Sequence, residues 1–299
     1  SELQDAHITQ MLCQLSELNS IEIDKCAQVT DHAFSDLYEQ RLRIDMGEVR
    51  GTLAKLDSLT ISNCPNVTGQ GLKYVIMALG GAGLSTIKMS NNGMVQAEAV
   101  QLAARRLQSL FLRGANSITE LILTACDNLE ELSIHGSLQL KRVTLEAPAL
   151  LRLSVTLGKM LQAARLVAPG LTNLNLSGCR ILDTLEISSA RLQTINMYGC
   201  MSIGESNLNG ILAPSFGTLE EVCLDGCERV GALIFRAPSM VKLCVKGCKS
   251  LGTLKLFNSR SLKEVDVRGC SQLQNLDIDG DCSFKKVQLL GKTSWRQQT

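Results

Sequence analysis

Residues 240–251 read MVKLCVKGCKSL, with apolar residues at positions 1, 4, 6 and 9 of the stretch, and Leu251 starts the same pattern again. The alternation over positions 4 to 6 is typical of a β-strand, in which successive side chains point to opposite faces. Small residues near position 9 indicate a turn. The stretch therefore predicts a short strand, a turn and a second extended segment.

This half-turn recurs every 10 or 11 residues from Leu107 onward, and two kinds alternate. The first kind starts at Leu107, Leu129, Leu150, Leu171, Leu192, Leu219, Met240 and Leu262. The second kind starts at Ile118, Leu140, Leu161, Leu182, Val230, Leu251 and Leu273. A full turn of mostly 21 or 22 residues falls within the period of leucine-rich repeats, about 20–29 residues.

Position 9 distinguishes the two kinds of half-turn. In the first kind a Gly precedes a Cys at Cys179, Cys200, Cys227, Cys248 and Cys270. In the second kind an Ala precedes a Pro at Pro148, Pro169 and Pro238. Gly tolerates turn conformations that a Cβ would penalise. We predict that positions 1, 4, 6, 9 and 11 fill the interior.

The N-terminal repeats are longer and leave room for helices. They start near Leu18, Leu56 and Leu84. Residues 30–34 and 67–76 read as a cap followed by a helix, and the Ala-rich segment 95–107 favours a helix by propensity. A further short helix is predicted to begin near Gly204. Residues 39–55 read as an insertion within one repeat.

These patterns predict an α/β solenoid of the leucine-rich-repeat horseshoe type with a parallel concave sheet. Its convex side is expected to carry helices in the N-terminal repeats and short extended segments in the C-terminal ones. We expect one domain over 1–299 with about twelve turns. Long repeats would occupy 1–106, compact repeats 107–290, and a C-terminal cap or tail with Trp295 would occupy 291–299.

The composition limits which classes of function are expected. The chain is 45% apolar and 20% charged with a net charge of +1, which argues against a general binder of nucleic acid or membrane surfaces. The spacing of most of the 12 cysteines follows the repeat, so free thiols in a reducing compartment, cytoplasmic or nuclear, are expected. No zinc motif, phosphate-binding loop or acid–base pair stands out, so we expect no enzyme, cofactor or metal.

Two groups of residues resemble known families. CAQVTD at 26–31 and CPNVTGQGL at 64–72 resemble the cysteine-containing leucine-rich repeats of F-box/LRR proteins. LDGC at 224–227, RAP at 236–238 and VKGC at 245–248 resemble plant F-box/LRR proteins. The resemblance implies a substrate receptor of a Skp1–cullin–F-box ubiquitin ligase. No F-box precedes the repeats, so a Skp1-type adaptor is expected only if an F-box lies outside this chain.

Side chains at positions 3, 5 and 7 of the first half-turn line the expected concave face. Among mostly Ser, Thr and Asn, this face gathers aromatic and Arg side chains, which interface hot spots favour. The candidate partner-binding residues are Phe111, Arg113, His135, Arg152, Asn175, Asn196 and Tyr198. The alternative is that scattered exposed aromatics have no function.

Positions 221 to 268 of this face alternate acidic and basic turns, which predicts neighbouring charges that neutralise one another. Cys223 and Cys244 share position 5 of adjacent turns, within disulfide reach. Lys242 and Lys246 flank Cys244 and would favour its thiolate. The pair is either a redox-sensitive spot or two small residues tolerated on a sheet.

Two functions remain open. The first is a protein- or peptide-binding module, by resemblance a ubiquitin-ligase substrate receptor. The second is a non-catalytic scaffold of a large assembly with no link to ubiquitin ligases. An F-box upstream in the full reading frame would favour the first.

Overall fold

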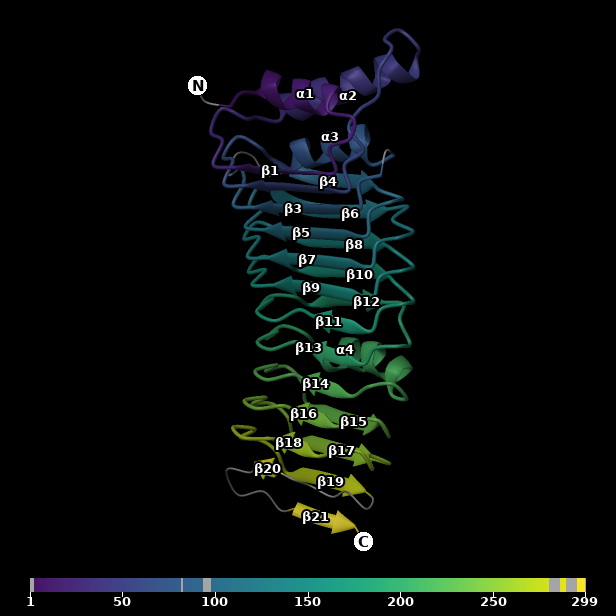
Figure 1. Ribbon diagram of the computed structural model, residues 1–299. Helices are drawn as coiled ribbons and strands as arrows, with labels where there is room; N and C mark the ends of the chain where they lie inside the picture. Colours follow the sequence, from purple (N-terminus) through teal and green to yellow (C-terminus); the bar gives the residue numbers. More distant parts are fainter. Residues whose placement is uncertain (1–2, 82, 94–97, 280–285, 289–294, 299) are drawn as a thin grey trace. The chain divides into compact units, whose positions relative to one another are not determined.

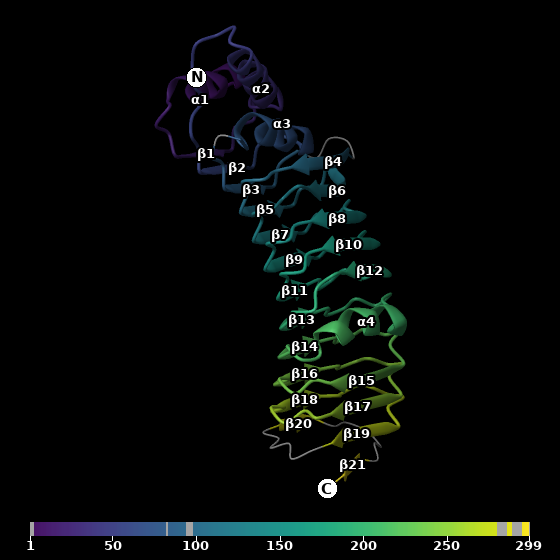
Figure 2. The same cartoon turned by 90° about the vertical axis from the view of Figure 1, so that its right-hand side faces the viewer.

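The structure, a computed structural model, describes residues 3–81, 83–93, 98–279, 286–288 and 295–298. The chain forms two compact units, Ser1–Leu150 and Leu151–Thr299. Each unit has a layer of parallel strands, here called the front, and an opposite layer, here called the back (Figures 1 and 2). The predicted α/β solenoid is therefore confirmed.

In the first unit the front strands follow one another in parallel. They are β1 (Ser20–Asp24), β2 (Ser58–Ser62), β3 (Thr86–Ser90), β5 (Ser109–Arg113) and β7 (Glu131–His135). The back begins with helices and continues with strands. Its elements are α1 (Asp5–Gln14), α2 (His32–Asp45), α3 (Gly69–Leu79), β4 (Glu98–Ala103), β6 (Ile118–Thr124) and β8 (Arg142–Glu146).

In the second unit most front strands are shorter. They are β9 (Arg152–Thr156), β11 (Asn173–Asn175), β13 (Thr194–Asn196), β14 (Glu221–Cys223), β16 (Lys242–Cys244), β18 (Glu264–Asp266) and β20 (Lys286–Gln288). The back consists of β10 (Ala163–Val167), β12 (Thr184–Ile187), α4 (Glu205–Leu212) with the 3-10 turn Ala213–Ser215, β15 (Ala232–Arg236), β17 (Thr253–Phe257), β19 (Asn275–Asp279) and β21 (Trp295–Gln298). Helix α4 contacts both β12 and β15 and replaces a back strand between them.

The core of each unit is a stack of equivalent apolar side chains. Neighbouring front strands pair without slipping, so that Leu174 faces Ile195 and Val222 faces Leu243 in the second unit. All four of these side chains are buried. Because a shift by one residue would move every side chain to the wrong face, the alternation specifies this register.

The position-9 cysteines form a second buried ladder. Their thiols donate to backbone carbonyls of the preceding turn, for example Cys200 Sγ to Leu176 O at 3.2 Å and Cys248 Sγ to Leu224 O at 3.1 Å. A thiol is a weak donor that is small enough for the interior of a turn. The repeat therefore selects Cys here for size and hydrogen bonding, as the small-residue prediction implied.

Three predicted helices are confirmed. Helix α3 begins after Thr68, whose hydroxyl accepts from the Gln70 N–H at 3.1 Å. Helix α2 starts at His32 and α4 at Glu205, next to the predicted starts. Helix α2 continues to Asp45, so the segment 39–55 is not simply an insertion: its first part is helix. The first helix, α1, was not predicted.

The helix predicted over 95–107 is wrong. Residues 98–103 form strand β4, which pairs with β6 and places Val100 and Leu102 in the core. Helix propensity is a weak preference that tertiary context overrides. Here the free edge of β6 provides backbone partners, and alternate side chains reach the core. Residues 94–97 lie outside the described residues.

The interior position of the Ala-Pro turns was also assigned wrongly. The buried residues are Ala147, Ala168 and Ala237, one position before the predicted prolines. Pro148 itself is exposed. Proline has no N–H to donate, so it is suited to the outer side of a turn. The predicted end at 291–299 lies outside the described residues except for β21, which pairs with β19.

Candidate functional site

Three candidate residues come together on the front of the first unit. Arg113 and His135 end neighbouring strands, are register partners, and are both exposed. Phe111 lies two residues before Arg113 and is half-buried. Lys88 Nζ lies 5.7 Å from the centroid of the Phe111 ring, a cation–π contact of about 0.5–1 kcal/mol at an exposed site.

The candidates of the second unit separate into two places. Arg152 begins β9 and is the register partner of Asn173, at the start of the strands. Asn175 and Asn196 are register partners at the ends of β11 and β13. Tyr198 follows β13 and is 59% exposed. Asn175, Asn196 and Tyr198 therefore lie together, and Arg152 lies at the opposite ends of the strands.

The two asparagines have a structural task that their sequence positions did not indicate. Asn175 Oδ1 accepts from the Ser177 N–H at 3.1 Å, and Asn196 Oδ1 accepts from the Tyr198 N–H at 3.1 Å. Such side-chain bonds to the N–H two residues on are Asx turns. They end the short front strands, so these side-chain oxygens are already engaged in the fold.

A hollow next to Tyr198 was not predicted. It lies where the front strands of the second unit turn toward the back and measures about 440 Å³. Its lining residues are Leu157, Lys159, Ser177, Gly178, Arg180, Tyr198, Gly199, Met201, Asp225, Gly226, Lys246 and Gly247. One signal was visible in the sequence: position 8 of this turn is Leu157, where the later compact turns have Gly.

The hollow carries more positive than negative charge. Lys159, Arg180 and Lys246 are exposed, and none of them forms an ion pair with another described residue of the chain. Asp225 is half-buried, and its Oδ1 accepts from the Lys246 N–H at 2.7 Å. Burial raises the pKa of Asp225, while this hydrogen bond lowers it.

Cys223 and Cys244 are register partners on β14 and β16, as their shared position predicted. Lys242 favours the Cys244 thiolate, as expected, but burial outweighs it. Burial, together with the nearby Asp225 and Cys223, raises the pKa of Cys244 to about 11, and Lys242 opposes them only in part. Burial also raises the pKa of Cys223. Both thiols are free and resist ionisation.

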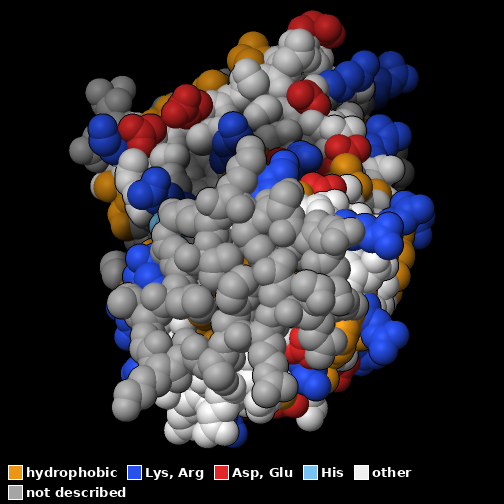
Figure 3. Space-filling view, turned by 90° about the horizontal axis from the view of Figure 1, so that it is seen from below, with side chains coloured by type: hydrophobic (Ala, Val, Ile, Leu, Met, Phe, Trp, Pro, Cys, Tyr) orange, Lys and Arg blue, Asp and Glu red, His pale blue; other side chains and the backbone are white. Residues whose placement is uncertain are grey.

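The charges of the last front strands neutralise one another, as predicted. Lys242 Nζ lies 3.5 Å from Glu264 Oε2. Arg268 donates from Nε and Nη2 to the buried Asp266, at 2.9 Å to Oδ1 and 2.6 Å to Oδ2. These bonds lower the pKa of Asp266. In the end-on view of Figure 3, side chains of both signs are interspersed over the visible surface that is not grey.

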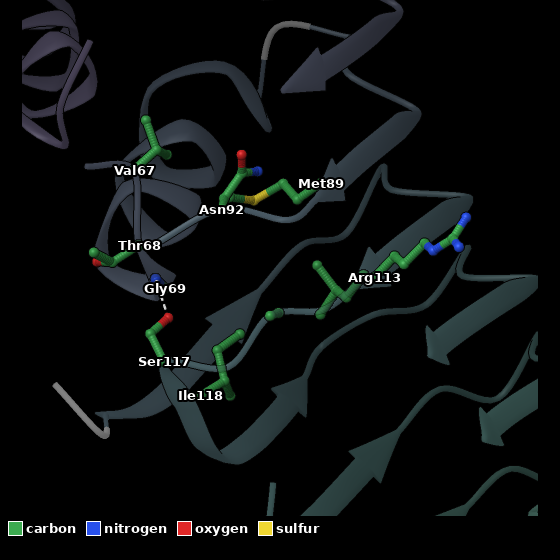
Figure 4. Close-up of a pocket in the computed structure, with 10 residues that line it drawn as sticks. Val67, Thr68, Gly69, Met89, Asn92, Arg113, Ser117 and Ile118 are labelled. Atoms are coloured by element: carbon green, nitrogen blue, oxygen red, sulfur yellow. Dashed lines mark hydrogen bonds between the residues drawn. The ribbon is translucent and has the colours of Figure 1, made fainter. Parts of the chain in front are cut away.

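A cavity in the first unit lies between α3, β3 and β6 (Figure 4). It measures about 10 Å³, which is near the space that one water needs, ~10–15 Å³. The buried Asn92 beside it donates to Ile61 O at 2.8 Å and accepts from the Cys64 N–H at 2.9 Å. At this size the cavity has room for about one water.

Within the described part of the chain, no three His, Cys, Asp or Glu side chains gather as metal ligands would. The helices that the structure describes are also too short or too polar to cross a membrane.

Comparisons with known proteins give little further information. No family model matches the sequence. No curated protein matches it. Among solved structures, the chain is similar to one described as "Crystal structure of Rad7 and Elc1 complex in yeast", at 12% identity and a TM-score of 0.25, over 98% of this chain and 82% of that one.

Proposed function

We propose that this chain is a non-catalytic module that binds a protein or peptide on its front. One observation supports this most: in each unit, parallel front strands hold polar side chains in register, and in the second unit a hollow of about 440 Å³ adjoins them. Repeat proteins use such extended faces for binding.

The size of the front favours a macromolecule over a metabolite. Neighbouring strands lie ~4.8 Å apart, so several strands present a row longer than a small ligand. In the first unit, Phe111, Arg113 and His135 lie on two neighbouring strands of this row. Aromatic and Arg side chains are the types that dominate binding energy at protein interfaces.

The finer proposal is a substrate receptor of a Skp1–cullin–F-box-type ubiquitin ligase. It is supported by the resemblance of residues 26–31, 64–72 and 224–227 to F-box/LRR proteins. Recruitment of a Skp1-type adaptor additionally requires an F-box outside this chain. We propose a cytoplasmic or nuclear location, because the described cysteines are free thiols.

The test is affinity purification of the tagged full-length protein from its source cells. Wild type is compared with Phe111→Ala/Arg113→Ala and, separately, with Tyr198→Ala. Lys255→Ala/Arg260→Ala, which changes only the back half-turn around β17, is the matched control. We expect Skp1 and cullin to co-purify with every form, and a further partner to be lost from a front variant but not from the control.

The opposite result favours the scaffold alternative. If subunits of a structural assembly co-purify instead, and both front variants retain them, the chain binds through another surface. The ubiquitin-ligase proposal and the front-face proposal would then both be wrong.

A further inference from the structure

The turn at Leu157 combines backbone strain with an exposed apolar side chain. Its φ is 56°, in the left-handed region that favours glycine. The equivalent residues of the next two turns are Gly178 and Gly199, with φ of 80° and 70°. Leu157 is nevertheless 49% exposed, so the core gains little from it. The left-handed conformation itself belongs to the repeat, because Lys25, Asn63 and Asn91 adopt it at the same position of earlier turns. What distinguishes Leu157 is an exposed apolar side chain at this position.

Leu157 has apolar neighbours in the hollow. Tyr198 is 59% exposed and Met201 is 38% exposed, and both line the same hollow. A methyl group at Gly178 would lie 3.0 Å from Leu157 Cδ2, so the Leu157 side chain lies directly over the next turn. These three are the large apolar side chains of the lining.

Basic side chains line the same hollow. The lining contains three cations, Lys159, Arg180 and Lys246, and one carboxylate, Asp225, which gives a net charge of +2. Asp225 is already engaged by the Lys246 N–H. The neighbouring Asp266 is paired with Arg268. An incoming carboxylate therefore meets Lys159 and Arg180, which form no ion pair with another described side chain, and Lys246, whose charge also acts on Asp225 and Asp266.

We propose that this hollow binds an acidic peptide segment of a partner protein. An aliphatic or aromatic side chain of the segment packs on Leu157, Tyr198 and Met201, and its Asp or Glu carboxylates pair with Lys159, Arg180 and Lys246. This inference rests on the proposed protein-binding function and names the chemistry of the partner. An apolar anchor within a charged rim is the usual organisation of a peptide interface.

The charges favour a peptide over a nucleic acid. A phosphate backbone carries regularly spaced negative charges along its whole length and would also pass the half-buried carboxylate of Asp225, which lines the same hollow. A short acidic segment places its carboxylates only where the cations lie. The small net charge of the chain, +1, agrees with this.

The experiment is selection of a phage-displayed random heptapeptide library on the immobilised full chain. We expect enrichment of sequences in which Asp or Glu flanks Leu, Phe, Tyr or Trp. The selected peptide is then titrated by fluorescence anisotropy. Arg180→Glu/Lys246→Glu should weaken its binding at least tenfold, and Leu157→Gly at least threefold without lowering Tm. Lys255→Glu/Arg260→Glu is the control of equal charge and should leave binding unchanged.

Several outcomes would overturn the inference. They are enrichment of neutral or basic peptides, absence of enrichment, tighter binding of single-stranded oligonucleotide than of the acidic peptide, and unchanged affinity in both hollow variants. If selected peptides lose binding in Phe111→Ala/Arg113→Ala but not in the hollow variants, the protein-binding function stands and the hollow is not its site.

Discussion

The carboxylate of Asp5 holds Thr30 by two hydrogen bonds, accepting from its backbone N–H at 2.6 Å and from its hydroxyl at 2.7 Å. The same arrangement joins Asp31 to Thr68 one turn later, at 2.7 and 2.6 Å. Each Asp lies at the start of one helix and each Thr at the start of the next. These paired Asp–Thr hydrogen bonds, here called the clamp, therefore fix the stacking of the helical turns.

The first prediction concerns this clamp. Asp31→Ala should lower the free energy of unfolding by about 2–4 kcal/mol, because hydrogen bonds to charged groups are worth ~1.5–3 kcal/mol each and the Thr68 N–H loses its partner. Gly71→Ala should also destabilise, since its Cβ would collide with the Asp31 carboxylate. Urea unfolding followed by circular dichroism measures both. Unchanged midpoints would mean that the clamp contributes nothing.

The second prediction concerns strain. Leu157→Gly should raise the free energy of unfolding by roughly 0.5–1 kcal/mol, because a strained backbone conformation costs ~1–3 kcal/mol and the flexibility of Gly in the unfolded chain offsets part of the gain. Differential scanning calorimetry measures the change in Tm. The control, Gly199→Leu, introduces the same strain at a position where a Cβ meets nothing within 4 Å, and it should lower Tm. A fall in Tm for Leu157→Gly would show that this side chain stabilises the fold.

The third prediction is a dependence on pH. Arg268 lowers the pKa of Asp266 in the folded chain. A lowered carboxyl pKa contributes stability that is present above the unfolded value, about 3.9, and is lost as pH falls through the folded value. When the pH is lowered from 6 to 3, the Tm of wild type should therefore fall more steeply than the Tm of Asp266→Asn. Parallel curves would contradict the pairing.

The pKa of Asp225 is shifted in the opposite direction to that of Asp266. Burial raises its pKa. Its contribution to stability is therefore present below the pKa of the unfolded chain and is lost as the pH rises through the pKa of the folded chain. Asp225→Asn keeps an oxygen that can accept from the Lys246 N–H and removes a half-buried charge. We expect this variant to be as stable as wild type or more stable at pH 7. Destabilisation at pH 7 would show that the charge is needed.

The fourth prediction concerns the thiols. Burial raises the pKa of Cys200 to about 12 and that of Cys179 to about 11. A thiol of pKa about 11 is ionised to roughly one part in a thousand at pH 8. Labelling of the native chain with a thiol reagent at pH 8 should spare these two cysteines until the chain unfolds, as mass spectrometry of the peptides can show.

The front pair is tested in the same experiment. Cys223→Ser/Cys244→Ser should leave the labelling rate of the native chain nearly unchanged, because burial also raises the pKa of both thiols. A fast phase that disappears in this variant would restore the redox hypothesis.

The sequence alone determined the solenoid. Each turn meets neighbours like itself, so the positions that must be apolar, small or able to turn recur at a fixed period, as at Leu243, Val245, Gly247 and Cys248. A helix cap can also be recognised from the local sequence, and Thr68 correctly indicated the start of α3.

Only the tertiary structure decided the features that depend on neighbours distant in sequence. Residues 98–103 became a strand because β6 supplied an edge. Asn175 and Asn196 end their strands, and Cys244 lost the ionisation that Lys242 and Lys246 suggested, because burial outweighs a nearby charge. The hollow joins single residues from several turns. Periodicity predicts the position of each within its turn, but their common exposure and charge arise only once the turns are stacked.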